Sequence, residues 1–364
     1  MKVAIVHDWF VGGGAERVVE QLHKMYPEAP IYTSYCSAEW RKKLGGQVVT
    51  GYLQHWPFSR LRKFLPPLRA LWFSRLNFDK YDLVISSSGA EAKGIKTGAS
   101  TTHINYCHAP THYYWSRYDD YLVSPGFGWL DPLARLGLKI LVGPMRRWDY
   151  KAAQRPDFML ANSNFIKEQI KKYYGRESDV IHPPVDVERF AGQVSEPRQG
   201  FVVAGRQTPY KRIDLAVAAC TQLELPLLVI GNGPQQRRLR GMAGKSVTFL
   251  RGKSDEELAE YFKSSQALIF PGIDDFGIVA VEALAAGTPV IAYKGGGALD
   301  YVQPSKTGEF FDEQTIESLV GLLKKFNPQA YNHDSIAKAA SKFDREHFQL
   351  AMKAFIDKHA RKNN

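Results

Sequence analysis

The sequence predicts an α/β protein with two doubly wound parallel sheets, one in each of two domains that face each other across a cleft. Two observations carry this prediction. Short runs rich in Val, Ile and Leu alternate with segments of helical periodicity, which is typical of parallel sheets covered on both faces. The chain also has 364 residues, more than one ordinary hydrophobic core accommodates. Ligands of such sheets bind beyond the carboxyl ends of the strands, so residues that follow strands are the first candidates for a site.

The expected strands and helices define the two domains. Apolar runs in the first half predict strands at 3–9, 83–88, 103–110 and 158–163. The second half is more regular, with strands at 201–205, 227–233, 247–252, 267–272 and 289–293 and helices that start near Lys211, Gln235, Asp255 and Phe276. The polar stretch 191–200 marks the boundary. The expected domains are therefore 1–190 and 191–342, followed by 343–364, whose helix could pack back across the first domain.

Composition restricts the partners. Lys and Arg exceed Asp and Glu by 48 to 37, a net charge of +11 that favours nucleic acid, a phosphate-bearing ligand or an anionic membrane. The cysteines, Cys36, Cys107 and Cys220, are too widely spaced to indicate zinc or a disulfide framework. The N-terminus reads as a first strand rather than a signal peptide, and no apolar run reaches the roughly 18 residues that span a bilayer. We expect a cytoplasmic protein, peripheral to a membrane at most.

The segment "GRQTPYKR" (205–212) places two cations after an expected strand. Arg206 follows the strand directly, and Lys211 stands five residues later, near the start of the next helix. Helix N-termini attract phosphate, and an Arg beside a Lys could clamp a diphosphate. The alternative is a solvated basic turn.

The glycine run 12–14 also lies between an expected strand and a helix. It matches a dinucleotide-binding loop only in part, because Arg17 stands where the third glycine belongs. The run could let the backbone approach an anion or a sugar. It could equally be a tight strand-to-helix turn.

The stretch "PGIDDFGIVAVEALAAG" (271–287) places acids around an apolar helix. With a helix start near Phe276, Asp275 is suited to cap the helix and Asp274 remains able to reach a ligand. Glu282 then lies roughly 9 Å along the axis, about the reach from a diphosphate to a ribose. A carboxylate can accept two hydrogen bonds from ribose hydroxyls.

These segments together resemble glycosyltransferase family 4. "DDFGIVAVEALAAGTPVIA" is similar to the family signature of two acids around Phe-Gly, here Asp274 and Glu282, although the family usually has Glu at the first position. "GRQTPYKR" matches its Arg and Lys, and "GGAERVV" matches its N-terminal glycine loop. "GGGALDYV" (295–302) resembles a later motif, with Asp300 in place of the usual Glu. The similarity covers most of the chain.

The resemblance implies two Rossmann-like domains (the GT-B fold), retention of anomeric configuration and a nucleotide-sugar donor. Arg206 and Lys211 would hold the diphosphate, Glu282 the ribose and Asp274 the transferred sugar. Backbone N–H groups of Phe276, Gly277 and Ile278 would add to the phosphate site. The remaining donor contacts would come from Gly13, Gly14, Arg251 and Gly252, the last two beside the nucleobase.

His108, in "NYCHAP", matches a family histidine near the donor sugar and joins Arg206, Lys211 and Asp274 as a candidate catalytic residue. Its alternative role is that of a hydrogen-bonded core or turn histidine. No residue stands out as an enzymic nucleophile.

No metal or other cofactor is expected. Negative charge grows on the leaving phosphate, where Arg, Lys and helix N–H groups can stabilise it without a metal. The acid pairs Asp119–Asp120 and Asp274–Asp275 are adjacent, a spacing that does not suggest a metal site on its own.

Segment 55–78 interleaves basic and aromatic residues and contains no acid. Such a segment suits an interface with anionic lipid. It could also stack on nucleic acid or form packed helices with a solvated basic face. A second aromatic cluster, 111–121, could shape an acceptor pocket or be ordinary loop packing.

The leading hypothesis is a transferase that moves mannose from GDP-mannose to a lipid-linked saccharide in polysaccharide biosynthesis, at the inner face of the cytoplasmic membrane. The alternatives are a transferase that uses a UDP-sugar and a nucleotide-sugar epimerase. A more distant one is a nucleic-acid-binding protein, although no nucleic acid is expected as a partner.

Overall fold

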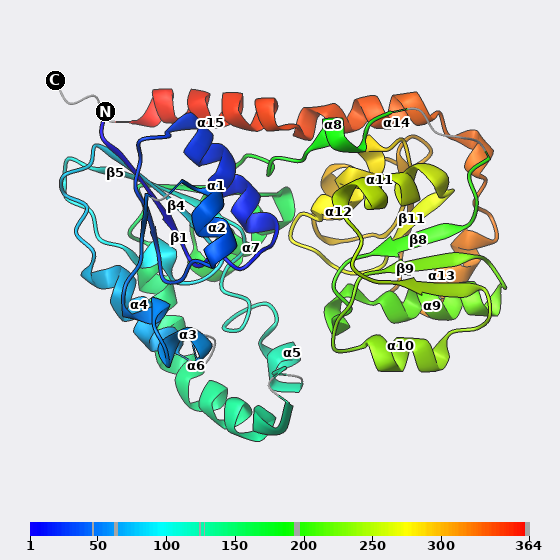
Figure 1. The fold of residues 1–364 in the computed structure, drawn as a ribbon, viewed down its shortest axis with the longest axis horizontal. Coiled ribbons are helices and arrows are strands. Elements are labelled where there is room, and N and C mark those ends of the chain that lie inside the picture. The colour runs from blue at the N-terminus through cyan, green and yellow to red at the C-terminus, as the bar shows by residue number, and fades with distance from the viewer. Residues whose placement is uncertain (46, 62–64, 124, 127, 193–196, 361–364) are drawn as a thin grey trace. The chain divides into compact units, whose positions relative to one another are not determined.

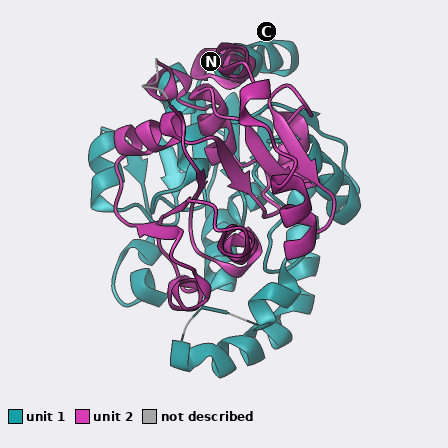
Figure 2. Ribbon diagram, turned by 90° about the vertical axis from the view of Figure 1, so that its right-hand side faces the viewer, with its two compact units in different colours: residues 1–184, 348–364 teal, residues 185–347 magenta. Residues whose placement is uncertain are grey.

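Two parallel β-sheets organise the chain in the computed structural model (Figure 1). The structure describes residues 1–364 except 46, 62–64, 124, 127, 193–196 and 361–364. Unit 1 comprises 1–184 and 348–364, and unit 2 comprises 185–347 (Figure 2).

The sheet of unit 1 has the strand order β3-β2-β1-β4-β5-β6-β7, with all neighbours parallel. Its strands are β1 (Val3–His7), β2 (Ile31–Thr33), β3 (Val48–Val49), β4 (Leu83–Ser88), β5 (Thr102–Cys107), β6 (Phe158–Ala161) and β7 (Asp179–Val180). Its α-helices are α1 (Gly14–Met25), α2 (Ala38–Lys43), α3 (Phe58–Leu61), α4 (Pro66–Arg75), α5 (Tyr118–Val123), α6 (Asp131–Ala153) and α7 (Asn164–Tyr174). The 3-10 turns are η1 (Tyr52–Gln54), η3 (Ala92–Gly94) and η4 (Gly128–Leu130).

Helices cover both faces of this sheet. Side chains alternate along a strand, so Ile5 of β1 packs in a cluster with α1, whereas Val6 packs in another with Phe73 of α4. The chain order reverses between β1 and β4, which are neighbours in the sheet. This reversal is the switch point where ligands of doubly wound sheets bind.

The sheet of unit 2 has the strand order β10-β9-β8-β11-β12-β13, again all parallel. Its strands are β8 (Phe201–Ala204), β9 (Leu227–Ile230), β10 (Val247–Leu250), β11 (Ala267–Phe270), β12 (Val290–Tyr293) and β13 (Gly308–Phe311). Its α-helices are α8 (Val187–Phe190), α9 (Ile213–Gln222), α10 (Gln236–Met242), α11 (Asp255–Ser264), α12 (Ile278–Ala285), α13 (Ile316–Leu323) and α14 (His333–Ala340). Its 3-10 turns are η5 (Pro209–Lys211), η6 (Gly296–Asp300), η7 (Pro328–Ala330) and η8 (Ser341–Phe343).

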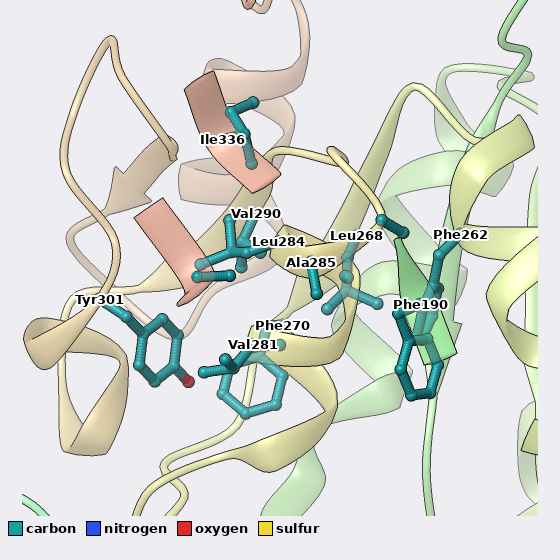
Figure 3. Packing of buried hydrophobic residues seen from close by; sticks show 14 of the residues in the cluster. Phe190, Phe262, Leu268, Phe270, Val281, Leu284, Ala285, Val290, Tyr301 and Ile336 are labelled. Atoms are coloured by element: carbon teal, nitrogen blue, oxygen red, sulfur yellow. The ribbon is translucent and has the colours of Figure 1, made fainter. Parts of the chain in front are cut away.

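Two cores sandwich this second sheet. One contains Phe270 and Val281 together with Ile336 of α14 (Figure 3), and the other contains Ile269 with residues of α9 and α13. Adjacent residues of β11 therefore face opposite helical layers. The predicted pair of doubly wound parallel sheets is confirmed.

The division between the units falls at Val185 rather than at the predicted residue 191. The reason is local packing, because Phe190 of α8 lies 6.0 Å from Phe262 of α11, ring centroid to centroid, inside unit 2 (Figure 3). Part of the predicted boundary stretch lies outside the described residues. Near the other end, α15 (Arg345–His359) carries Phe348, and this residue packs in the core of unit 1.

The predicted lipid-facing segment 55–78 does not form one surface. It breaks into α3, α4 and irregular backbone, and residues 62–64 lie outside the described residues. The prediction is wrong for Arg69, Phe73 and Phe78, which are buried. The Arg69 guanidinium donates to both oxygens of Glu91, at 2.8 and 3.0 Å, and so is committed to the interior. No helix in the described part of the chain is long and apolar enough to cross a membrane.

We expect the buried His103 of β5 to make the stability of the protein depend on pH. Its ring is fully buried, with Nε2 2.7 Å from Ser86 Oγ, and burial followed by the charges of Arg176 and Arg155 lowers its pKa to about 3. In the unfolded chain the ring takes up a proton near its usual pKa of about 6.5. Unfolding therefore binds one extra proton between these values, and stability falls as the pH falls through this window.

We expect the free energy of unfolding to lose up to about 1.4 kcal/mol per pH unit through His103 alone. Urea unfolding at several pH values, for wild type and His103→Gln, measures the effect. Unfolding of the variant should take up about one proton fewer, so its free energy of unfolding should change less steeply with pH. Equal slopes would show that His103 is not the group responsible.

Candidate active site

The predicted phosphate-binding residues of unit 2 lie at the carboxyl ends of β8 and β11. These strands are neighbours and parallel, and the chain order of the sheet reverses between them. Arg206 and Lys211 follow β8, and Asp274 follows β11. Connections diverge to opposite faces at such a switch point and leave a crevice there.

Lys211 and Asp274 form an ion pair across this switch point. Lys211 Nζ donates to Asp274 Oδ2, and the two side chains are only 17% and 11% exposed. The second oxygen of Asp274, Oδ1, is buried and has no hydrogen-bond partner among the described residues. A buried acceptor without a donor is costly, so this oxygen is available to a ligand hydroxyl.

Glycine allows the two loops to approach each other. A Cβ on Gly272 would lie 2.8 Å from both Lys211 Cα and Tyr210 O, closer than real Cβ contacts. The backbone after β11 can therefore lie against the turn that ends at Lys211 only because residue 272 has no side chain. This contact explains how residues 63 positions apart come to share one hydrogen bond.

Helix α12 begins later than predicted and has a different cap. It runs from Ile278 to Ala285, and Gly277 is the N-cap residue with a φ of 92° and no side-chain cap. The predicted cap by Asp275 is wrong, because the chain enters the helix through a left-handed conformation that glycine tolerates. The first N–H groups of any helix lack acceptors within it, so the start at Gly277 and Ile278 suits an anion.

Two residues of the signature, Phe276 and Glu282, are buried. Phe276 belongs to the hydrophobic core, so only its backbone is suited to meet a ligand. Glu282 is 4% exposed on α12 and lies four residues beyond the helix start, roughly 6 Å along the axis rather than 9 Å.

The loop after β12 holds the acidic loop in place. Gly297 N donates to Asp274 O at 2.8 Å, and Tyr301 Oη donates to Phe276 O at 2.9 Å. A Cβ on Gly297 would lie 2.4 Å from Phe276 Cα. Burial, and then the charges of Asp274 and Asp300, raise the pKa of Tyr301 well above its usual value, so its hydroxyl stays protonated and donates. Sequence reasoning noticed this motif but missed the positioning role of Tyr301.

Arg206 and Arg251 are both exposed at the ends of their strands. Arg206 Nη2 lies 3.4 Å from Tyr210 Oη, whereas Arg251 Nη2 donates to Gln236 Oε1. Gly252, beside Arg251, has a left-handed φ of 60°. The two arginines therefore hold different local partners.

Two glutamines near these arginines were missed by sequence reasoning. Gln207 is fully buried after β8, and its Oε1 has no hydrogen-bond partner among the described residues. Gln236 is also buried, and its Nε2 has no hydrogen-bond partner among those residues. Gln207 Nε2 donates to Gly231 O at 3.1 Å and so links the loops after β8 and β9. The signal available in the sequence was a glutamine, Gln207, two residues after the expected strand 201–205.

In unit 1 the glycine run follows β1, as expected. Gly13 is the N-cap residue of α1, which begins at Gly14. Glu16 Oε1 accepts from Val11 N at 3.2 Å and Gly12 N at 2.9 Å. The helix thus supplies its own carboxylate to the start of the loop, while Gly13 and Gly14 remain exposed.

His108 directly follows β5 and is half-buried. Its Nε2 lies 2.7 Å from Ser87 Oγ, and Ser87 O in turn accepts from His7 Nδ1 at 2.9 Å. Ser87 of β4 therefore links the two histidines at the carboxyl edge of this sheet. The ring is held in one orientation, which suits a group that positions a substrate.

The aromatic segment 111–121 packs partly into the interior of unit 1. Asp149 of α6 accepts from Thr111 Oγ1 at 2.9 Å, Trp115 Nε1 at 2.8 Å and Tyr174 Oη at 2.7 Å. Lys93 Nζ lies 2.7 Å from the same carboxylate, and both side chains are fully buried.

Across the described residues, no group of three or more His, Cys, Asp or Glu is arranged to hold a metal ion.

Comparison with known protein families matches nearly the whole chain. The model for "Glycosyltransferase Family 4" matches residues 12–189, and the model for "Glycosyl transferases group 1" matches residues 184–343. Curated relatives include a D-inositol 3-phosphate glycosyltransferase of Mycobacterium sp. (strain KMS), 28% identical over 204 residues, 47% of this chain and 46% of the relative. The human alpha-1,3/1,6-mannosyltransferase ALG2 is 27% identical over 233 residues, 48% of this chain and 56% of the relative. The chain thus aligns with about half the length of these relatives.

Solved structures with a similar fold cover the chain more fully. Anabaena Alr3699/HepE, in complex with UDP, has a TM-score of 0.72 and 17% identity over 98% of this chain and all of its own. WaaG, a glycosyltransferase involved in lipopolysaccharide biosynthesis, has a TM-score of 0.65 and 15% identity over 99% of this chain and 100% of its own. At these identities the likeness supports the fold alone, and it agrees with two Rossmann-like sheets of the GT-B type.

Proposed function

Since the chain belongs to the glycosyltransferases, with a family 4 domain followed by a group 1 domain, we propose that it moves a hexose from a nucleotide-diphosphate sugar to a lipid-linked saccharide. Mannose from GDP-mannose is the first donor to test. We place the reaction in polysaccharide biosynthesis, at the inner face of the cytoplasmic membrane.

The observation that carries the proposal is the Lys211–Asp274 pair at the switch point of unit 2. Lys211 would stabilise the negative charge that grows on the leaving diphosphate, and Arg206 and the N–H groups at Gly277 and Ile278 would share this role. Asp274 Oδ1, which is buried without a partner among the described residues, would accept a hydrogen bond from a hydroxyl of the transferred sugar.

The bond changes balance without a further reactant. The bond between the anomeric carbon and the diphosphate oxygen breaks, and its electron pair stays on the phosphate. The acceptor hydroxyl oxygen forms the new bond on the same face, and its proton passes to the phosphate oxygen. Retention then follows without an enzymic nucleophile. No step needs a metal or another cofactor.

Each unit contributes further proposed donor contacts. Glu282 would accept from ribose hydroxyls, and Arg251 with Gly252 would lie beside the nucleobase. In unit 1, His108, held by Ser87, would contact the donor sugar, and Gly13 and Gly14 would allow a close backbone approach.

The relatives support two donor classes. Human ALG2 is named as a mannosyltransferase, which favours a mannose donor. HepE was solved with UDP and with UDP-glucose, which supports a UDP-sugar as the second candidate. WaaG is described as involved in lipopolysaccharide biosynthesis, so a lipid-linked saccharide is the first acceptor class to test.

A donor panel tests the proposal. The full chain is incubated with GDP-mannose, UDP-glucose or UDP-N-acetylglucosamine, with and without EDTA, and products are identified by mass. We expect slow release of a nucleoside diphosphate from one donor, unchanged by EDTA. Asp274→Asn, of nearly the same shape, should slow this release. If no donor is bound or hydrolysed, the proposal is wrong, and an isomerised nucleotide sugar would favour the epimerase instead.

A further inference from the structure

Large apolar side chains lie exposed along the N-terminal half of α6. Leu133, Leu136 and Ile140 are 66%, 55% and 64% exposed. Two residues that precede the helix are also exposed: Trp129 of η4 at 87% and Val123, the last residue of α5, at 75%. Exposed apolar residues that occur singly are ordinary, but a cluster of this kind marks an interaction site.

Helix geometry places the three α6 residues on one face. Their spacings of three, four and seven residues put their side chains in one stripe. The opposite face is anchored through Met145 and Asp149, both buried in unit 1. The stripe is therefore a second apolar face, and in Figure 1 this half of α6 extends away from the sheet of its unit.

Basic residues flank the stripe. Between 132 and 148 the sequence contains four basic residues, Arg135, Lys139, Arg146 and Arg147, and no acid. Arg135, Lys139 and Arg147 are exposed, and Arg135 Nη2 donates to Val123 O at 2.8 Å, which ties the preceding segment to the helix. Arg146 instead donates inward to Tyr114 O.

We propose that this α6 face, defined by Leu133, Leu136, Ile140, Lys139 and Arg147, docks on an anionic lipid bilayer. An apolar stripe with a basic flank fits the boundary between acyl chains and anionic headgroups. A symmetric second copy fits less well, since it would bring together helices that carry Arg135, Lys139 and Arg147 with Asp131 as the one acid before Asp149. Only the role of this docking depends on the proposed function: it would bring unit 1 to a lipid-linked acceptor.

Vesicle flotation of the full chain tests this surface. The probes are phosphatidylcholine vesicles with and without phosphatidylglycerol. We expect binding to the anionic vesicles only, with weaker binding at high salt because screening shortens the reach of surface charges. Leu133→Gln/Leu136→Gln/Ile140→Gln should raise the apparent Kd more than about tenfold. Lys139→Glu/Arg147→Glu should also lose binding to the anionic vesicles. This variant tests the surface independently if the triple variant does not fold.

The matched control is Trp56→Gln/Leu61→Gln, which removes exposed apolar residues from segment 55–78 and should bind like wild type. The surface is refuted if the α6 variants bind normally or if the control is the one that loses binding. It is also refuted if light scattering shows a wild-type dimer that the triple variant dissociates. Donor hydrolysis in buffer separates the two proposals, since it should be normal in the triple variant. Vesicle binding without any donor hydrolysis would reject the function and leave the surface standing.

Discussion

Lys211→Ala should lower kcat for donor hydrolysis and transfer by about 100- to 1,000-fold, the usual effect of removing one preorganised group that stabilises developing charge. Lys211 is the mostly buried cation at the switch point of unit 2, and it already holds Asp274. Its removal takes away positive charge where the leaving diphosphate would sit. It also leaves Asp274 without its partner, so both the phosphate and the sugar contacts suffer. Steady-state kinetics with the active donor measures the effect.

The matched control is Lys294→Ala. Lys294 lies 3.3 Å from Asp312, in a pair whose side chains are 59% and 76% exposed, so its loss should leave kcat within about twofold. Lys211→Arg keeps the charge but alters its geometry and should recover part of the activity. A thermal unfolding curve checks that Lys211→Ala is folded. Wild-type turnover by a folded Lys211→Ala protein would remove this residue from the site.

Lys93→Met should destabilise unit 1 by roughly 3–5 kcal/mol, the range for breaking a buried ion pair on one side. Lys93 and Asp149 are both fully buried, and burial acts to lower the pKa of Lys93, but the charge of Asp149 outweighs it and raises that pKa. The variant leaves a buried carboxylate whose remaining partners are neutral hydroxyl and indole donors. Urea unfolding of the full chain measures the change.

A double variant separates the lost pair from lost packing. Lys93→Met/Asp149→Asn removes both charges, so it should be more stable than Lys93→Met alone. Lys294→Met, at the exposed pair, should change stability by less than about 0.5 kcal/mol. If Lys93→Met matches this exposed control, the buried pair is not important for stability.

The architecture was predictable because the composition of each strand by itself indicates that the strand is buried. Runs such as "VAIV" (3–6) and "ALIF" (267–270) are apolar at every position, which is typical of a strand covered on both faces. The cations after β8 and the acids after β11 were predictable in the same way, since each follows its own strand directly. Local composition thus indicated which strand ends carry chemistry.

The partners and orientations of these side chains were not predictable. The Lys211–Asp274 bond depends on the pairing of β8 with β11 and on the close approach at Gly272. The start of α12 at Ile278 depends on the left-handed turn at Gly277, whereas Asp275 looked like the better cap by side-chain chemistry. The prediction for segment 55–78 was wrong at Arg69 because a basic and aromatic composition does not show that this residue pairs with the buried carboxylate of Glu91.

The sequence alone therefore determined the class of fold, the two units in outline and the strand ends that carry charge, because these depend on residues adjacent in the chain. Only the tertiary structure decided which charges meet, which are buried and which apolar face is left open on α6. Those outcomes depend on contacts between residues tens of positions apart, and a hydrogen bond or a burial energy exists only once strand order and helix packing have brought both partners together.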